Sequence, residues 1–186
     1  MNYKNKRAAL EMGVGTIVTI VLLVTVLILG AALIQNIFKS AKGVVDLTDQ
    51  QLRGELDKLF SEEQQITIYP STRLVEIKQD NIDGIGIGIK NLLTGSGTKK
   101  FAYKVEVSDP KINQKCGVDS REAESWIVSG QEEKGIIIPS GDFSIQKVLF
   151  NIPVGSPLCV IRFRVNVDVD GSPYGTDFFD ISTKGK

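Results

Sequence analysis

The side chains of this 186-residue chain offer few groups that could catalyse a reaction. The sequence contains no histidine, so the commonest general base and the commonest metal ligand of proteins are both missing. A Ser-His-Asp or Cys-His arrangement is therefore impossible. Two carboxylate pairs are left, Glu122 with Glu124 and Asp168 with Asp170, and such pairs could act as they do in glycosidases.

The sequence around the second carboxylate pair favours a turn over a metal site. Asp168-Val169-Asp170-Gly171 resembles the start of a calcium-binding loop, but the later ligands of that loop are missing. Two isolated cysteines do not make a tetrahedral zinc site. We therefore predict a hairpin turn at Asp170-Gly171, and we expect no metal, no cofactor and no enzymatic activity.

The two cysteines, Cys116 and Cys159, are predicted to pair with each other. Cys116 falls in a polar stretch, which reads as a loop, and Cys159 begins a long predicted strand. In a chain exposed to an oxidising compartment, an even pair of cysteines most simply forms one disulfide. The alternative is two free thiols.

The longest structural element that the sequence predicts is an apolar segment near the N-terminus. Residues 12–34 are uncharged and mostly apolar, and they follow a basic tail containing Lys4, Lys6 and Arg7. This length predicts a transmembrane helix over 12–38, with the tail at 1–11 in the cytoplasm and the remainder outside the cell. A cleaved secretory signal would have a shorter apolar core, so an ordinary anchor and a pilin-type helix are the main alternatives.

The residues after this segment keep a helical pattern. Val45, Leu52, Leu56, Leu59 and Phe60 form one apolar stripe, which predicts an amphipathic stem helix over 39–65. The whole helix would run continuously from about 8 to 62. The stripe has two interpretations, packing against the chain's own domain or contact between subunits.

Residues 66–186 change to the alternating pattern of β-strands. Seven to nine short runs are separated by turn clusters, which predicts an extracellular antiparallel β-sandwich, immunoglobulin-like in type. The predicted fold class is therefore α+β, a long helix followed by this sandwich. Gly84, Gly86 and Gly88 alternate with isoleucines, and a strand face without side chains lets a helix approach closely. We expect the stem helix to lie there.

The start of the chain resembles a known family. Residues 6–18, KRAALEMGVGTIV, are similar to the start of archaeal type IV pilin-like and archaellin-like proteins, with a class III-type signal segment. In that family a short basic leader and a Glu precede a long apolar helix that carries no charge. The resemblance implies cleavage by a prepilin-type peptidase and packing of the helices in a filament core. It assigns processing and assembly to the residues Lys6, Arg7, Ala8, Ala9 and Glu11.

Two details of this N-terminal region have alternative interpretations. Cleavage between Lys6 and Arg7 would make Glu11 the fifth residue of the mature chain, as is common in the family, whereas cleavage after Ala8 would make it the third. Glu11 itself would either stay at the membrane interface or pair with a cation of a neighbouring subunit.

The sequence thus predicts a pilin-like subunit of an archaeal cell-surface filament that is inserted in the membrane before assembly. Its expected partners are the lipid bilayer and other copies of the chain, bound through the N-terminal helix. The alternative is a single-pass membrane protein that displays an immunoglobulin-like domain for adhesion or envelope interaction. Basic and acidic residues balance at 22 each, so we expect no nucleic-acid partner.

Overall fold

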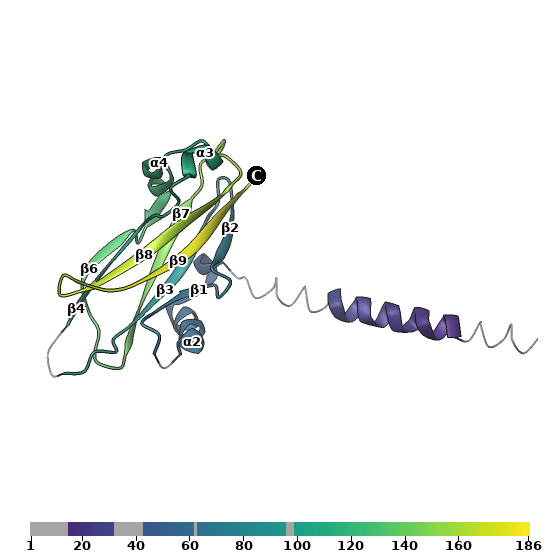
Figure 1. The fold of residues 1–186 in the computed structure, drawn as a ribbon, viewed down its shortest axis with the longest axis horizontal. Helices are drawn as coiled ribbons and strands as arrows, with labels where there is room; N and C mark the ends of the chain where they lie inside the picture. The colour runs from purple at the N-terminus through teal and green to yellow at the C-terminus, as the bar shows by residue number, and fades with distance from the viewer. Residues whose placement is uncertain (1–14, 32–42, 62, 96–98) are drawn as a thin grey trace, which may run out of the picture. The chain divides into compact units, whose positions relative to one another are not determined.

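The structure, a computed structural model, describes residues 15–31, 43–61, 63–95 and 99–186 (Figure 1). The chain divides into two compact units, Met1–Lys42 and Gly43–Lys186. The stem region from Gly43 onward belongs to the same compact unit as the β-strands, whereas the sequence predicts divisions at 12–38, 39–65 and 66–186.

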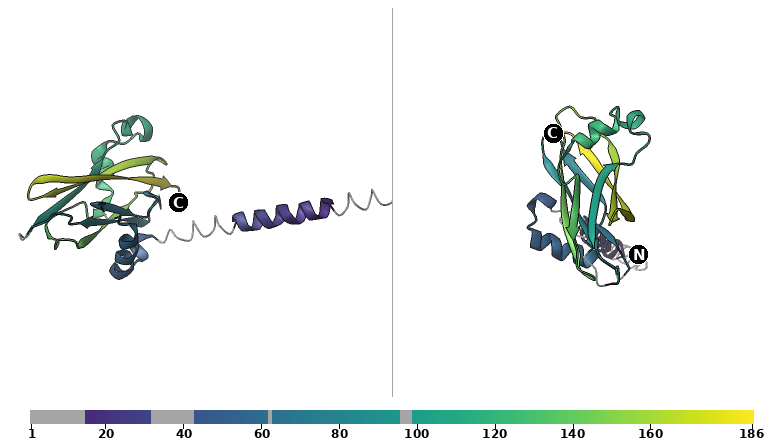
Figure 2. Two further views of the ribbon diagram at one scale, coloured as in Figure 1. Left: turned by 60° about the horizontal axis from the view of Figure 1, so that its bottom comes forward. Right: turned by 90° about the vertical axis from the view of Figure 1, so that its left-hand side faces the viewer.

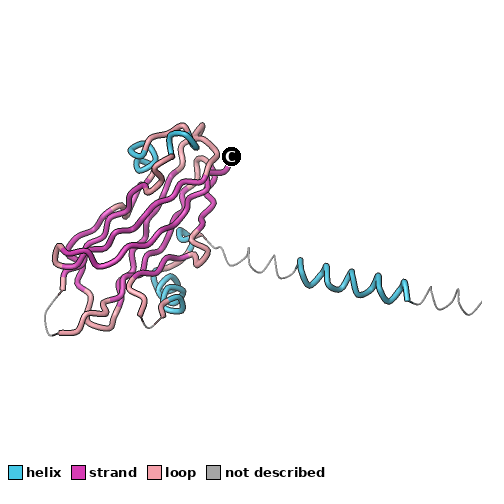
Figure 3. Tube along the Cα trace, viewed as in Figure 1, coloured by secondary structure: helices cyan, strands magenta, loops and turns pink. Residues whose placement is uncertain are grey.

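The first unit contains a helix at 15–31 (Figure 3). No helix among the described residues is long and apolar enough to cross a membrane. At a rise of 1.5 Å per residue, the described helix is shorter than the roughly 30 Å of a bilayer's hydrocarbon core. The predicted transmembrane helix over 12–38, and the single-pass membrane localisation that depended on it, are corrected by this finding. Residues 12–14 and 32–38 of that prediction lie outside the described residues.

The predicted continuous helix is interrupted in the stem. Gly43 precedes a single 3₁₀ turn, η1 (Val44–Asp46), which ends at an extended residue, Leu47. A separate helix, α2 (Asp49–Leu59), begins after its N-cap residue Thr48, whose backbone is also extended. Thr48 and Gln51 form a reciprocal capping box that satisfies two of the first free N–H groups of α2.

The apolar stripe of α2 packs against the chain's own domain. Leu52 and Leu56 are fully buried, together with Val44 of η1 and Tyr69, in a small core of their own. Leu52 and Leu56 of the predicted stripe thus contact the chain's own domain, whereas Val45 of that stripe lies in η1 and is 47% exposed.

Nine strands make up most of the second unit, in agreement with the predicted seven to nine. Their bounds are β1 (Ile66–Tyr69), β2 (Leu74–Lys78), β3 (Ile82–Lys90), β4 (Lys100–Val107), β5 (Ile127–Ser129), β6 (Glu132–Ile137), β7 (Phe143–Asn151), β8 (Val160–Val169) and β9 (Ser172–Lys184). Two short helices, α3 (Ile112–Cys116) and α4 (Ser120–Ser125), lie in a stretch that the sequence reading treated as a loop. The fold is mostly β.

The strands form two sheets rather than a clear immunoglobulin-like sandwich, so that part of the predicted fold class is wrong. One sheet has the order β1-β3-β7-β5 and the other β2-β9-β8-β4-β6. The pairing of β2 with β9 is parallel, so the second sheet is mixed rather than antiparallel. The chain changes sheet at every connection from β1 to β8, and only β8 and β9 follow one another within one sheet (Figures 1 and 2).

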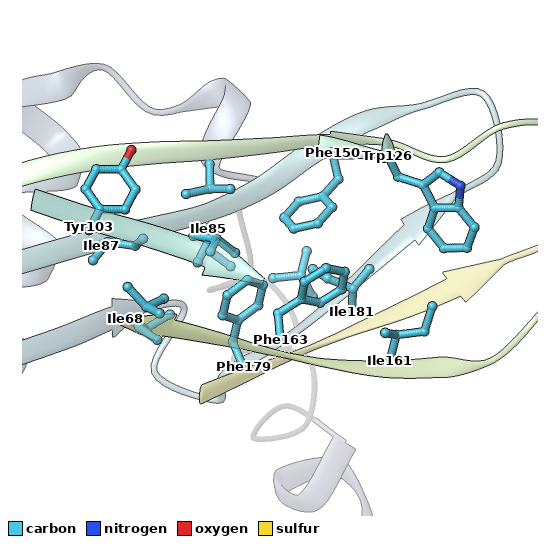
Figure 4. Packing of buried hydrophobic residues seen from close by; sticks show 14 of the residues in the cluster. Ile68, Ile85, Ile87, Tyr103, Trp126, Phe150, Ile161, Phe163, Phe179 and Ile181 are labelled. Atoms are coloured by element: carbon cyan, nitrogen blue, oxygen red, sulfur yellow. The ribbon is translucent and has the colours of Figure 1, made fainter. Parts of the chain in front are cut away.

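The main core is built by the inward side chains of both sheets. Ile85 and Ile87 of β3 and Phe150 of β7 come from the first sheet, and Phe163 and Phe179 come from the second (Figure 4). The Phe150 and Phe163 rings meet edge-on, with centroids 5.1 Å apart. The strict alternation that the sequence shows along β8 is thus explained, since every second residue faces this core.

The glycine row of β3 allows two close approaches. A Cβ atom on Gly86 would lie 2.6 Å from Cδ1 of Leu52, and one on Gly88 would lie 2.8 Å from the Phe60 ring. The expectation that the stem helix lies over this row is therefore confirmed. A Cβ atom on Gly84 would lie within bonding distance of the carbonyl oxygen of Val148, so at this end the row admits the neighbouring strand instead.

Replacing Gly86 by Ala should lower the free energy of unfolding by about 1–3 kcal/mol, because the new methyl group overpacks the buried Leu52 side chain. Gly54→Ala is the matched control. Gly54 lies inside α2 with nothing within 4 Å of its added Cβ, so this substitution should stabilise the protein by up to about 1 kcal/mol. Urea unfolding measures both, and equal effects of the two substitutions would contradict the packing argument.

Candidate functional site

The helix at 15–31 presents apolar side chains on all sides. Each of its large apolar residues is half exposed or more, up to 72% for Leu27. Its polar side chains do not interrupt this surface, because Thr19 and Thr25 donate their hydroxyl groups to the carbonyl oxygens of Gly15 and Val21. A helix that is apolar all round is normally covered in its working state, so this helix is the first candidate for a binding surface.

The residues assigned to processing and assembly cannot be placed. Lys6, Arg7, Ala8, Ala9 and Glu11 all lie outside the described residues. The structure therefore tests neither the cleavage site nor the environment of Glu11.

Cys116 and Cys159 form the expected disulfide, with their Cα atoms 5.7 Å apart. Cys116 is the last residue of α3, and Cys159 directly precedes β8. The bond thus ties the two short helices to the second sheet. Asp119 caps α4 by accepting from the backbone N–H of Glu122, a signal in the sequence that could have revealed this helix.

Two of the four candidate acid–base carboxylates, Glu124 and Asp170, make contacts that hold parts of the fold together. Glu124 accepts a hydrogen bond from the backbone N–H of Val107 at 2.9 Å, which holds α4 against β4. Asp170 and Gly171 form the two-residue turn between β8 and β9, both with positive φ, so the predicted hairpin turn is confirmed. Within the described residues, no group of three His, Cys, Asp or Glu side chains could hold a metal ion.

Glu106 is the centre of a polar cluster on the outward face of the second sheet. Its carboxylate accepts hydrogen bonds from Nε of Arg164 and Nδ2 of Asn166, both at 2.8 Å, and forms an ion pair with Lys104 at 3.3 Å. The hydrogen bonds from Arg164 are the main reason that the pKa of Glu106 lies below its ordinary value. Cross-strand pairs of this kind hold β4 and β8 in register.

A second group of side chains lies where α2 meets the start of β7, and we call it the clasp: Arg53, Asp142 and Phe143. Nη2 of Arg53 lies 2.7 Å from Oδ1 of Asp142, and its guanidinium carbon lies 4.3 Å from the centre of the Phe143 ring. The clasp also satisfies the backbone of Phe143, whose C=O accepts from Arg53 and whose N–H donates to Asp142. Sequence patterns could not predict this group, because Arg53 and Asp142 are 89 residues apart.

The clasp separates two hollows. One, of about 530 Å³, is lined by α2 together with Lys90 and Gly141. The other, of about 510 Å³, lies on the far side of Arg53, along the first half of β7. Both hollows open to solvent, and Arg53, Asp142 and Phe143 line both of them.

The pH dependence of stability should reveal the Glu106 cluster. Because the folded state lowers the pKa of Glu106, this group stabilises the fold above its unfolded pKa, and that contribution is lost as the pH falls through the folded pKa. Glu106→Gln should therefore be less stable than the wild type at pH 7, and the gap should close below about pH 4. Thermal unfolding from pH 7 to pH values below about 4 measures this gap. Glu55→Gln, which removes an exposed ion pair with Lys58, is the control and should have little effect at any pH.

Removing the disulfide should cost substantial stability. The bond closes a loop with a sequence separation of 43 residues, which corresponds to about 4 kcal/mol through the entropy of the unfolded chain. The double variant Cys116→Ser/Cys159→Ser should unfold at correspondingly lower denaturant concentration than the oxidised wild type. Thiol labelling of the unreduced native protein should be nil, and full labelling of both cysteines would contradict the assignment.

Comparison with known proteins gives only weak similarities. No protein-family model and no curated protein matches the chain. Among solved structures, the periplasmic chaperone SfaE is similar over 65% of this chain and 57% of its own, with 8% identity and a TM-score of 0.37. The Pseudomonas fluorescens alkylpurine DNA glycosylase AlkC, bound to DNA containing an abasic site analog, is similar over 63% of this chain and 30% of its own, with 11% identity and a TM-score of 0.32. The chain thus spans less than two thirds of either protein.

Proposed function

We propose that this protein is a pilin-like subunit of a cell-surface filament, in which helices at 15–31 from several copies pack together. The observation that carries the proposal is the apolar surface of this helix, which continues around its whole circumference. Contact with a single partner helix would cover one stripe only. Several neighbours are needed to cover every side, and a helical bundle at the centre of a filament provides them.

Two further features support this proposal. The sequence at 6–18 resembles the start of archaeal pilin-like and archaellin-like proteins, which assemble through such a helix. The Cys116–Cys159 disulfide is typical of proteins that work in an oxidising compartment, as the outside of a cell is.

A single charged substitution tests whether the helix at 15–31 binds other copies of the chain. Leu23→Lys places an ammonium group on a helix residue that is 65% exposed, so the substitution disturbs little packing among the described residues. Buried between packed helices, an unpaired charge costs several kcal/mol, so this variant should not form filaments. Sedimentation and electron microscopy of the purified full chain measure assembly.

Leu158→Lys is the matched control, since Leu158 is also 65% exposed but lies in the second unit. This variant should assemble like the wild type. A wild-type chain that stays monomeric at all concentrations, or equal assembly of both variants, would refute the proposal. N-terminal sequencing of filaments sheared from cells would then distinguish cleavage after Lys6 from cleavage after Ala8.

A further inference from the structure

Half of one edge of β7 has no neighbouring strand. On one side β7 pairs with β3 along its whole length. On the other side β5 pairs only with Leu149 and Phe150, after which the chain leaves for β6 in the other sheet. Gly130, just beyond β5, lies against the C=O of Lys147, where an added Cβ would come within 2.0 Å of that oxygen. The first part of β7, residues 143–146, is therefore without a neighbouring strand on this side within the described part of the chain.

The pairing pattern shows which backbone groups face this open edge. The N–H of Asn91 donates to the C=O of Asp142 at 2.9 Å, and the register then alternates along the antiparallel pair. Ser144 and Gln146 thus bond to β3, whereas Phe143, Ile145 and Lys147 direct their N–H and C=O groups away from it. The N–H of Asn151, which follows the same alternation, donates to Trp126 on the β5 side.

The clasp partly protects this edge. Asp142 and Arg53 occupy the N–H and the C=O of Phe143, at 2.8 and 3.3 Å, as a neighbouring strand would. Among the described residues, no side chain replaces a strand in this way at Ile145. The N–H and C=O of Ile145 are therefore the groups through which the open edge can bind another molecule.

The space beside this edge has the dimensions of a short peptide. The hollow of about 510 Å³ is lined by six consecutive residues, 142–147, which means that the edge of the strand faces it. Its opposite wall is apolar and includes Ile137, which is 63% exposed, and Pro139. The charged groups at its rim are paired, Arg53 with Asp142 and Lys147 with Asp49, so the slot carries no net charge.

We propose that this slot binds an extended, uncharged segment of a partner protein, which adds to β7 as a short strand. Two main-chain hydrogen bonds to Ile145 would hold it, and its apolar side chains would contact Ile137 and Pro139. About four or five residues fill the length of the open edge. Recognition of this kind rests on the peptide backbone, with side-chain pockets adding specificity. This proposal is independent of filament formation.

Hydrogen exchange at the Ile145 amide tests the proposal on the full chain. The probe is a blocked pentapeptide of alternating valine and threonine. With a Kd of about 1 mM, an excess of about 10 mM peptide should slow exchange of this amide roughly tenfold. The same peptide with its central amides N-methylated keeps its side chains but cannot pair, and should leave the exchange rate unchanged.

Two variants sharpen the test. Ile145→Pro removes an N–H that is not used within the sheet, so the fold should persist while peptide binding is lost. Peptide binding to that variant is measured by isothermal titration calorimetry. Arg53→Met frees the C=O of Phe143 and should tighten binding severalfold, since it adds one acceptor to the open edge. Equal protection by the N-methylated peptide, or no protection in either the wild type or Arg53→Met, would overturn the proposal.

Discussion

The second unit depends on the close approach of α2 to the main chain of β3. Gly86 and Gly88 have no side chains, so Leu52 and Phe60 of the stem region pack directly onto the strand. Leu52 also belongs to the second small core, which includes Leu56 of α2. At Gly84 the same lack of a side chain admits the backbone of β7. The position of α2 follows from this contact, and with it the position of Arg53. The clasp and the two hollows beside it are consequences of a row of three glycines.

The polar clusters have a different role from the glycine row. Glu106 and its partners lie on an outward face and hold neighbouring strands in register, while the clasp replaces a missing strand with side chains. Burial destabilises the charged form of one carboxylate, Asp177. The pKa of Asp177 is raised, mainly because the group is desolvated, although Arg73 and the N–H of Phe178 favour its charge. This carboxylate therefore penalises the fold as pH rises through its folded pKa, opposite in sign to Glu106.

Local patterns in the sequence predicted the features that depend on local physics. The alternation along β8, the turn at Asp170-Gly171 and the approach of the stem to the glycine row all follow from residues close together in the chain. The break before α2 could also have been predicted, since Thr48 and Gln51 have the spacing of a capping box. The parallel pairing of β2 with β9 and the open half of β7 could not, because each depends on which distant segments meet. The prediction of a membrane-spanning helix depended on the length of the apolar run at 12–34, and it was wrong.

The pairing of β2 with β9 also has a consequence for how the protein folds. Leu74 lies beside Asp180, so strands about 100 residues apart in sequence must meet to complete the second sheet. In this sheet β9 lies between β2 and β8, and it contributes Phe179 and Ile181 to the core. The second sheet therefore cannot be completed until β9 is available to pair with β2 and β8. Contacts between segments so far apart in sequence form slowly, so the folding of this unit should be slow.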